Sequence, residues 1–471
     1  MSTYYVATNG DDTNTGGEFS PFKTVAKAIT MVAPGDTVYL RAGDYTEKIV
    51  ANVSGLFGAR IKIAGYPDET VNMDMSETSM TAAEGAVTVR AGFVTIDNLQ
   101  ITNPTTNGVY VATAEASTVQ NITIPSYSGY GIRVSNTTPG KQNSYIQNCN
   151  ILGNGDGITV SRADGGYWYI GNNKVSGTGK GISVGSADGP AHHIIVRSNE
   201  ITATSSTAID MGGGTYYADY FVVESNTVRN PQVSGQSVRF SPGLTTIGCI
   251  QRFNVIDSHH LEYYLYPPVS CKVYNNTVSN STYFVQFTNA TATAAHYQES
   301  LSGFGFYNNL FYTNSLAPFD DGASGPANYG TLGFDGNAFL FSASDDIDWG
   351  STYTSDKDGW NSWRFTESAD LNGYIFTTLP GATTYPRQNG GSYLTTIVSG
   401  SGTTWVVGDA SFFSNGYGLV AGDTLKVGKK TAVINTISYA SNTIEFTSSQ
   451  TFTVGDPVSY NHTGFGPDVG A

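Results

Sequence analysis

Charged and hydroxyl-bearing residues occupy the same position in five short apolar segments of the chain. Each segment alternates apolar with polar or small residues, as in Gly131-Ile-Arg-Val134 and Gly181-Ile-Ser-Val184, which is the pattern of a β-strand with two distinct faces. Stacked side by side, the five strands would align these residues in one column: Arg133, Thr159, Ser183, Asp210 and Arg239. Asp210 and Arg239 are then expected to be neighbours that both point to solvent.

A strip of small residues runs beside this column. Its members are Ser135, Ser161, Gly185, Gly212 and Ser241, and such a strip favours a groove that admits an extended polymer. Lys180 and His192 lie in turns that adjoin the same strands. Cleavage of a uronate polymer by β-elimination needs a neutralised carboxylate, a base and a proton for the leaving oxygen. The candidate catalytic residues are therefore Asp210, Arg239, Lys180 and His192.

Further residues near the strip suit binding. The candidate substrate-binding residues are Arg133, Arg162, Tyr216, Tyr217 and Tyr264, the last as the continuation of the column after Arg239. Asp156, Asp164 and Asp188 are candidate ligands for Ca²⁺, which prefers carboxylate oxygens. These carboxylates and that of Asp210 also form pairs of the kind that a glycoside hydrolase uses. The sequence contains no zinc-ligand spacing, phosphate loop or Ser-His-Asp signature, and no organic cofactor is expected.

The elements that must position these residues come from a repeat. An apolar anchor, an asparagine two or three places later and a second apolar residue five places later recur from residue 96 to 311, for example in Ile96-Asp-Asn98-Leu-Gln-Ile101. Successive anchors are 23 to 33 residues apart, and no helical periodicity intervenes. This pattern predicts a solenoid of short strands joined by Asn- and Gly-rich turns. The asparagines are expected to form a hydrogen-bonded ladder between coils.

The chain resembles right-handed parallel β-helix proteins of the pectate-lyase-like superfamily. The repeats carry this resemblance together with three N-terminal segments: 4–12 (YYVATNGDD), 20–29 (SPFKTVAKAI) and 34–40 (PGDTVYL), which are similar to the segment that caps the first coil in that superfamily. It covers roughly residues 3 to 380. The resemblance implies an all-β fold, but the same solenoid carries lyases, hydrolases, epimerases and phage tailspikes.

Two regions flank the regular coils. Ser20 and Pro21 predict the start of an amphipathic helix over residues 21–33 that caps the solenoid. From about Gly390, six short apolar segments separated by Gly-Asp and Ser-Asn turns predict a small β-barrel or sandwich. We therefore expect a β-helix with its cap over residues 1–389 and a small β domain over 390–471, with regular coils at about 96–311.

Composition limits the partners. A net charge of −15 disfavours nucleic acid as a ligand. The chain has no apolar run long enough for a membrane span and no signal peptide at Met1. Of the three cysteines, Cys149 is predicted to be a core residue. Stacking could bring Cys249 and Cys271 close enough for a disulfide, although none is expected.

Together these patterns favour a carbohydrate-active enzyme that cleaves an acidic polysaccharide by β-elimination. A glycoside hydrolase on the same fold and a non-catalytic, glycan-binding, tailspike-like virion protein are the alternatives. The resemblance implies a secreted, extracellular or virion-associated protein. It is expected to be a monomer, or a trimer if tailspike-like, with a polysaccharide as partner.

Overall fold

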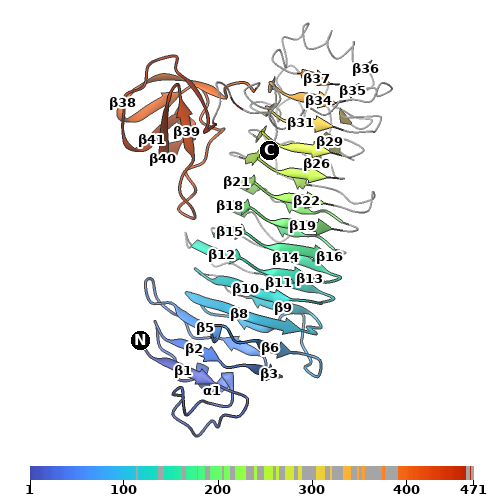
Figure 1. Cartoon of the computed structure of the whole chain (residues 1–471), viewed down its shortest axis with the longest axis vertical. Helices are drawn as coiled ribbons and strands as arrows, with labels where there is room; N and C mark the ends of the chain where they lie inside the picture. Colours follow the sequence, from blue (N-terminus) through green and yellow to red (C-terminus); the bar gives the residue numbers. More distant parts are fainter. Residues whose placement is uncertain are drawn as a thin grey trace. The chain divides into compact units, whose positions relative to one another are not determined.

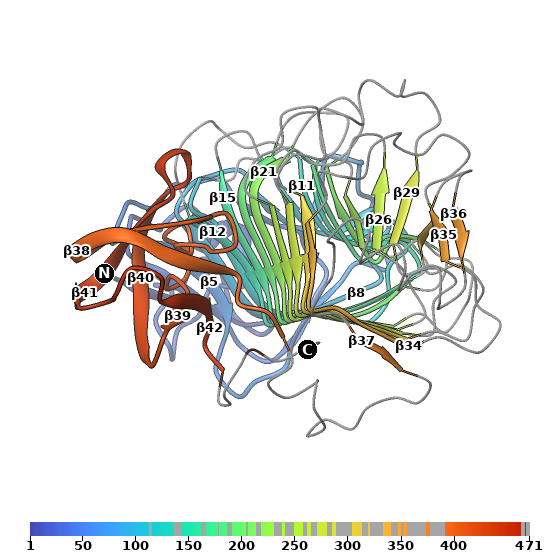
Figure 2. The same ribbon diagram turned by 90° about the horizontal axis from the view of Figure 1, so that it is seen from above.

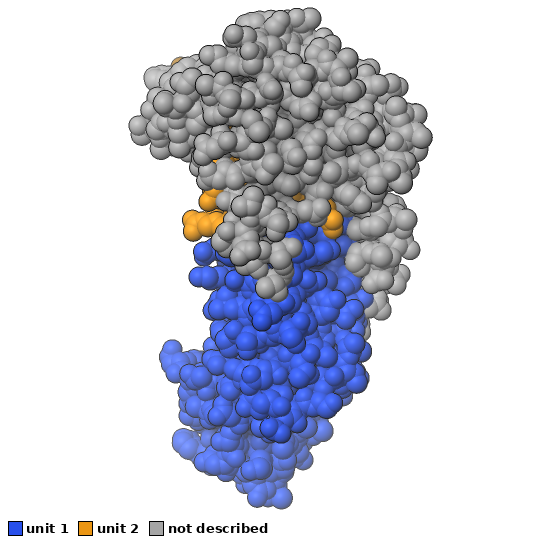
Figure 3. Space-filling view, turned by 90° about the vertical axis from the view of Figure 1, so that its right-hand side faces the viewer, with its two compact units in different colours: residues 1–216 blue, residues 217–471 orange. Residues whose placement is uncertain are grey.

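A computed structural model gives the fold of the chain. It describes residues 1–112, 115–135, 143–161, 166–177, 179–185, 191–203, 206–212, 218–229, 238–240, 249–257, 261–264, 271–279, 285–288, 304–312, 319–320, 333–340, 347–349, 353–355, 374–376, 391–462 and 467. The chain divides into two compact units, residues 1–216 and 217–471 (Figure 3). Each unit is described by itself.

The first unit is a stack of parallel strands in two sheets (Figure 1). One sheet contains β1 (Thr3–Val6), β2 (Thr37–Leu40), β3 (Gly43–Tyr45), β5 (Ile61–Gly65), β6 (Val71–Asp74), β8 (Val94–Thr102), β10 (Thr118–Ile124), β12 (Asn143–Gln147), β13 (Asn150–Leu152), β15 (Tyr167–Gly171), β16 (Lys174–Gly177), β18 (Ala191–Arg197) and β19 (Glu200–Ala203). The other sheet contains β4 (Ile49–Ala51), β7 (Gly85–Val89), β9 (Asn107–Val111), β11 (Tyr130–Val134), β14 (Asp156–Val160), β17 (Ile182–Val184) and β20 (Ile209–Met211).

In the first unit the predicted anchors lie at the same register position of successive coils. Ile96, Val119, Ile146, Ile170 and Val196 are register partners on successive parallel strands, and each is at most 1% exposed. Figure 2 shows these strands lying one behind another. Because equivalent residues of successive coils stack, one apolar residue in each coil suffices to build a continuous core. The predicted parallel β-helix is therefore confirmed.

The second unit continues the same kind of coil and adds a barrel. Its coil strands are β21 (Ala218–Glu224), β22 (Thr227–Arg229), β23 (Val238–Phe240), β24 (Cys249–Arg252), β25 (Val255–Asp257), β26 (Leu261–Tyr264), β27 (Cys271–Tyr274), β28 (Thr277–Ser279), β29 (Val285–Thr288), β30 (Gly305–Tyr307), β31 (Leu310–Tyr312), β32 (Phe319–Asp320), β33 (Gly333–Asp335), β34 (Ala338–Leu340) and β37 (Tyr374–Phe376). β35 (Ile347–Trp349) and β36 (Tyr353–Ser355) form an antiparallel pair.

The predicted C-terminal β domain is a closed antiparallel barrel. It consists of β38 (Thr395–Val407), β39 (Thr424–Val427), β40 (Lys430–Ser438), β41 (Thr443–Gln450) and β42 (Pro457–Tyr460), with a short 3₁₀ helix at Tyr439–Ser441 between β40 and β41. The segments expected as separate strands at 394–398 and 405–407 join into the single strand β38, which passes through Gly400 and Gly402 at positive φ. The boundary expected near residue 390 stays a prediction.

The N-terminal helix is shorter than predicted. α1 spans only Val25–Ile29, and its N-cap is Thr24, whose hydroxyl accepts a hydrogen bond from the Lys27 amide. Ser20 and Pro21 are not helical, because the following residue, Phe22, bonds to strand β1 through its amide and its carbonyl. Val25, Ala28 and Ile29 are buried, as expected of a capping element.

The asparagine ladder is present and uses two adjacent columns. Asn98, Asn121, Asn148 and Asn172 turn the chain with φ of 53° to 57°. The next position carries the ladder: the Asn173 amide N–H and Nδ2 both donate to Asn199 Oδ1 at 3.0 Å. In the second unit the same bonds link Asn226, Asn254, Asn276, Asn309 and Asn337. Buried amides that bond between coils satisfy groups that would otherwise destabilise the turn.

Register corrects one anchor of the repeat. Val223, Gln251 and Val273 are partners on successive strands of the second unit, so the anchor of this coil is Gln251 rather than the predicted Ile250. Successive residues of a strand point to opposite faces. Ile250 therefore lies on the face that turns away from the coil interior, although it is fully buried. The cysteine predictions hold: all three are buried and free, and Cys249 is the register partner of Cys271.

Glycines at the strand entries allow the coils to pack closely, and this predicts a stability effect. A Cβ added at Gly157 would lie 2.2 Å from Val175 Cγ1 and 2.6 Å from the Gly181 carbonyl oxygen. We expect Gly157→Ala to destabilise the protein by about 1–3 kcal/mol through overpacking, measured by urea unfolding. Gly17→Ala is the control, because its Cβ would meet only Thr15 Oγ1 at 3.8 Å. Equal unfolding midpoints for the two variants would contradict the expectation.

Among the described residues no helix has the length and hydrophobicity needed to cross a bilayer.

Candidate functional site

The predicted polar column exists in the first unit. Tyr110, Arg133, Thr159, Ser183 and Asp210 are register partners on β9, β11, β14, β17 and β20. They share one face of the shorter sheet, because register partners on successive parallel strands point the same way. Of the five, Arg133 is partly exposed and the other four are buried, so the prediction that the column points to solvent is wrong for those four. The predicted alignment of Arg133, Thr159, Ser183 and Asp210 is confirmed.

Asp210 forms an ion pair with Lys180. Lys180 Nζ lies 2.6 Å from Asp210 Oδ2, and the lysine side chain is 34% exposed while that of Asp210 is 2% exposed. The prediction that Asp210 points to solvent is wrong, since the carboxylate is covered. Removing a carboxylate from water is unfavourable unless a charged partner or hydrogen bonds compensate. Lys180 supplies such a partner, and its own side chain stays partly exposed.

A neighbouring turn holds Lys180 in place. The Lys180 amide donates a 2.8 Å hydrogen bond to Asp156 Oδ1, so the first residue of β14 orients the turn that precedes β17. Gly179 is required at this turn, because an added Cβ would lie 2.4 Å from Asp156 Oδ1. Two predicted site residues, Asp156 and Asp210, thus contact opposite ends of a third, Lys180.

Arg133 belongs to a separate part of the column. It lies three strands from Asp210, about 14 Å at the usual spacing of 4.8 Å between strands. Its guanidinium carbon is 4.7 Å from the centre of the Tyr130 ring, and Nη1 donates to the Ala82 carbonyl at 3.5 Å. The substrate-binding role predicted for Arg133 stays a prediction.

His192 lies on the other sheet. It belongs to β18, whereas Asp210 belongs to β20 of the shorter sheet. The adjacent His193 stacks on Tyr167 with ring centres 4.4 Å apart and planes inclined by 23°. The expected proximity of His192 to Asp210 stays a prediction.

Arg239 lies in the second unit, on β23, so its pairing with Asp210 also stays a prediction. The register partner of Arg239 on β26 is Glu262. Tyr264 lies two residues further along β26, and the expectation that it continues the column is wrong. The sequence alignment missed Glu262, although the alternation of Leu261-Glu-Tyr-Tyr264 carried the signal that would have placed it.

Several predicted residues lie outside the described part of the chain: Arg162, Asp164, Asp188, Tyr216 and Tyr217. Among the residues that the structure describes, no three His, Cys, Asp or Glu side chains are grouped as metal ligands. Of the proposed calcium ligands only Asp156 is described, and one of its oxygens accepts the Lys180 amide proton. The calcium site therefore stays a prediction.

Comparison with known proteins supports the fold. Residues 4–183 match the family model described as "Pel9A-like, right handed beta helix region". The chain is 39% identical over 80 residues to uncharacterized protein YwoF of Bacillus subtilis, covering 17% of each protein. It is 27% identical over 144 residues to pectate lyase L of Paenibacillus polymyxa, covering 30% of this chain and 32% of that protein. These alignments span a third or less of either relative.

A solved structure extends the likeness to most of the chain. The crystal structure of pectate lyase Pel9A superposes with a TM-score of 0.50 at 14% identity, covering 83% of this chain and 92% of that one. At this identity the superposition concerns the fold alone. The stacked parallel strands and the family-model match to residues 4–183 agree with it. Residues 4–183 thus match a right-handed β-helix family, and the coils of the chain have the parallel β-helix fold.

Proposed function

We propose that the protein cleaves an acidic polysaccharide by β-elimination at a site centred on Lys180 and Asp210. The observation that carries the proposal is the 2.6 Å ion pair between a covered carboxylate and a partly exposed ammonium on the polar column. Covering a carboxylate with a lysine as partner gives little net stability, because the cost of removing the charges from water offsets their attraction. A partly exposed lysine fixed by two carboxylates is instead well suited to binding an anionic ligand.

β-Elimination breaks the C5–H bond and the C4–O bond of a uronate and forms a C4–C5 double bond. The C5 proton passes to a base, and the leaving oxygen takes up a proton. Lys180, whose Nζ lies 2.6 Å from Asp210 Oδ2, offers positive charge to the C6 carboxylate and a proton to the leaving oxygen. Asp210 positions it, while Arg239 and His192 remain the candidates for a second cation and the base.

Ca²⁺ bound by Asp156, Asp164 and Asp188 would add charge neutralisation at the substrate carboxylate. This part of the proposal rests on the donor type of these residues. A protein that acts on such a polymer meets it outside the cell, so we also propose a secreted or virion-associated location. The relative named pectate lyase L and the fold of Pel9A support the choice of an acidic polysaccharide.

A glycoside hydrolase is the second candidate. One observation favours it: Asp156 and Asp210 contact opposite ends of Lys180, so the site brings two carboxylates near one another. Hydrolysis needs two carboxyl groups about 5–9.5 Å apart on either side of the bond. A non-catalytic, tailspike-like binding protein is the third candidate and would be expected to form trimers.

One assay separates these functions. Purified protein is incubated with polygalacturonate, alginate and neutral glucans, with Ca²⁺ or with EDTA. Absorbance at 235 nm and reducing ends are followed together. We expect absorbance at 235 nm to rise on an acidic polymer, because elimination creates an unsaturated uronate. Reducing ends without absorbance would indicate a hydrolase. Binding without either signal, together with a trimer in size-exclusion chromatography, would indicate a tailspike-like protein.

A further inference from the structure

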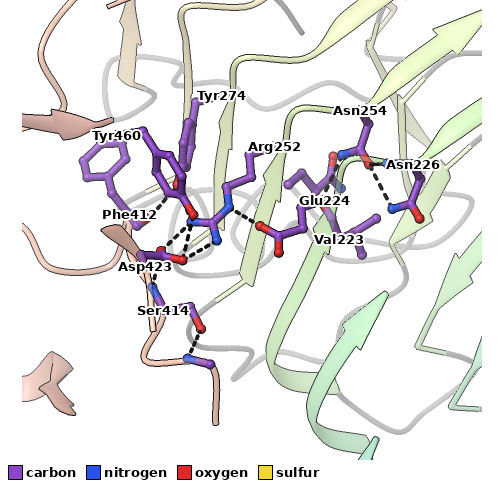
Figure 4. Close-up of polar contacts among 12 residues, drawn as sticks. Val223, Glu224, Asn226, Arg252, Asn254, Tyr274, Phe412, Ser414, Asp423 and Tyr460 are labelled. Atoms are coloured by element: carbon purple, nitrogen blue, oxygen red, sulfur yellow. Dashed lines mark hydrogen bonds and ion pairs between the residues drawn. The ribbon is translucent and has the colours of Figure 1, made fainter. Parts of the chain in front are cut away.

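A buried arginine joins the C-terminal barrel to the coils of the second unit. Arg252 on β24 is 0% exposed, and its Nη1 and Nη2 donate to the two oxygens of Asp423 at 2.6 and 2.7 Å (Figure 4). Its Nε donates to Glu224 Oε2 on β21 at 2.6 Å. Asp423 directly precedes β39 of the barrel. One guanidinium thus bonds to a carboxylate from the coils and to one from the barrel.

The surrounding groups complete this contact. Asp423 also accepts hydrogen bonds from Tyr460 Oη of the barrel and from the Ser414 amide, both at 2.8 Å. Tyr274 Oη accepts from Arg252 Nη1 at 2.8 Å and donates to the Phe412 carbonyl at 2.6 Å. The guanidinium carbon lies 4.5 Å from the centre of the Tyr460 ring. Burial alone would lower the pKa of Arg252, but Asp423 and Glu224 raise it well above its usual range.

A second ion pair repeats the arrangement one strand further along. Lys272 Nζ on β27 lies 2.9 Å from Asp409 Oδ2, and the lysine side chain is 4% exposed. The same ammonium lies 4.7 Å from the centre of the Phe412 ring. Burial would raise the pKa of Asp409, but Lys272 and hydrogen bonds from Ser411 lower it. Segment 409–423 therefore supplies one carboxylate to each of two buried cations: Asp423 to Arg252 and Asp409 to Lys272.

The outer face of β24 and β27, where these contacts lie, is buried. Ile250, Arg252 and Tyr274 are at 0% exposure, although they lie on the face that turns away from the coil interior. Separation of the barrel would expose the Tyr274 ring, which packs against Phe412 with ring centres 6.0 Å apart, to water. It would also remove the bidentate partner from Arg252. Both changes are unfavourable, because they lose apolar burial and break a paired, hydrogen-bonded charge.

We propose that the barrel is a permanently docked clamp on the coils at β21, β24 and β27, rather than a tethered module that moves to find its own glycan. Segment 409–423 of the barrel binds to the outer face of these strands. A tethered carbohydrate-binding module needs a binding surface free for its ligand. The acids and aromatic rings of this segment are instead used within the chain.

Cleavage between barrel and coils tests the clamp in the full chain. A protease recognition site is inserted between β37 and β38, and the cleaved protein is passed through a size-exclusion column without denaturant. We expect the barrel fragment to co-elute with the coils. In Arg252→Met we expect it to elute separately, because the contact loses both carboxylate pairings. A barrel fragment that leaves the cleaved wild-type protein would overturn the proposal.

Arg41→Met is the matched control. Arg41 also makes a forked contact with a carboxylate, that of Glu69, and lies 4.5 Å from the Tyr66 ring, but its side chain is 34% exposed and its partners lie in the first unit. The barrel fragment should still co-elute in this variant. If Arg252→Met does not fold, Lys272→Met in the uncleaved chain provides the test by hydrogen exchange. We expect at least threefold faster exchange in β39 and β42 and an unchanged rate in β8; unchanged exchange in all three strands would overturn the proposal.

Discussion

Lys180→Met is expected to lower kcat/KM on the acidic polymer by about a hundredfold or more, with little change in the melting temperature. The ammonium is the partly exposed member of the 2.6 Å ion pair, so its loss removes charge from the place where the proposed substrate carboxylate binds. Asp210→Ala should lose activity to a similar extent, because the lysine then lacks its fixed counterion. Initial rates at 235 nm over a range of substrate concentrations measure both effects.

Lys62→Met is the matched control for this experiment. Lys62 Nζ lies 2.7 Å from Asp97 Oδ2, with side-chain exposures of 36% and 10%, on the other sheet of the same unit. It resembles the Lys180 pair in type, distance and exposure, but not in position. We expect Lys62→Met to keep activity within about twofold of the wild type. Equal losses in both lysine variants, or full activity in Lys180→Met, would move the site away from Lys180.

Arg239, which the sequence predicts as the neighbour of Asp210, is tested in the same assay. Arg239→Ala is expected to lose about a hundredfold if Arg239 serves as the second cation at the substrate. Full activity in Arg239→Ala together with a large loss in Lys180→Met would assign the cationic role to Lys180 alone. Each variant should be checked for an unchanged far-ultraviolet circular dichroism spectrum.

Asn173→Ala is expected to give the largest loss of stability in the first unit, about 2–4 kcal/mol. The side chain is 2% exposed; its Nδ2 donates to the Ile146 carbonyl and to Asn199 Oδ1 at 3.0 Å, and its Oδ1 accepts the Cys149 amide at 2.9 Å. Alanine leaves the amide of Cys149 and the carbonyl of Ile146 without these partners in the interior. Urea unfolding followed by circular dichroism measures the loss.

Asn172→Gly distinguishes the contribution of the buried ladder to stability from that of the turn. Asn172 is the neighbouring residue, exposed and at φ 57°, a conformation that glycine adopts readily. We expect this variant to unfold within about 0.5 kcal/mol of the wild type. A loss in Asn172→Gly as large as that in Asn173→Ala would show that the turn geometry, and not the buried ladder, stabilises the coil.

The sequence alone predicted the coils and the polar column, because both depend on short-range periodicity. Alternation within Gly131-Ile-Arg-Val134 and its counterparts assigned each residue to a face, and repeat spacing assigned the neighbours of each strand. Periodicity assigned the wrong residue where an apolar side chain is buried on the outer face of a strand rather than in the coil interior. The repeat predicts Ile250 as an anchor because it is apolar, but Gln251 occupies that position and Ile250, on the opposite face, is also fully buried.

Only the tertiary structure decided which of the column residues meet. Lys180 reaches Asp210 across 30 residues of sequence, from a turn to a strand of the following coil, and covers a carboxylate that periodicity had placed in solvent. Arg252 and Asp423 are 171 residues apart, and no local pattern connects them. Periodicity specifies the face on which a side chain lies. What covers that face, and therefore which charges must pair, depends on segments that are distant in the chain, since the cost of burying a charge arises only when they come together.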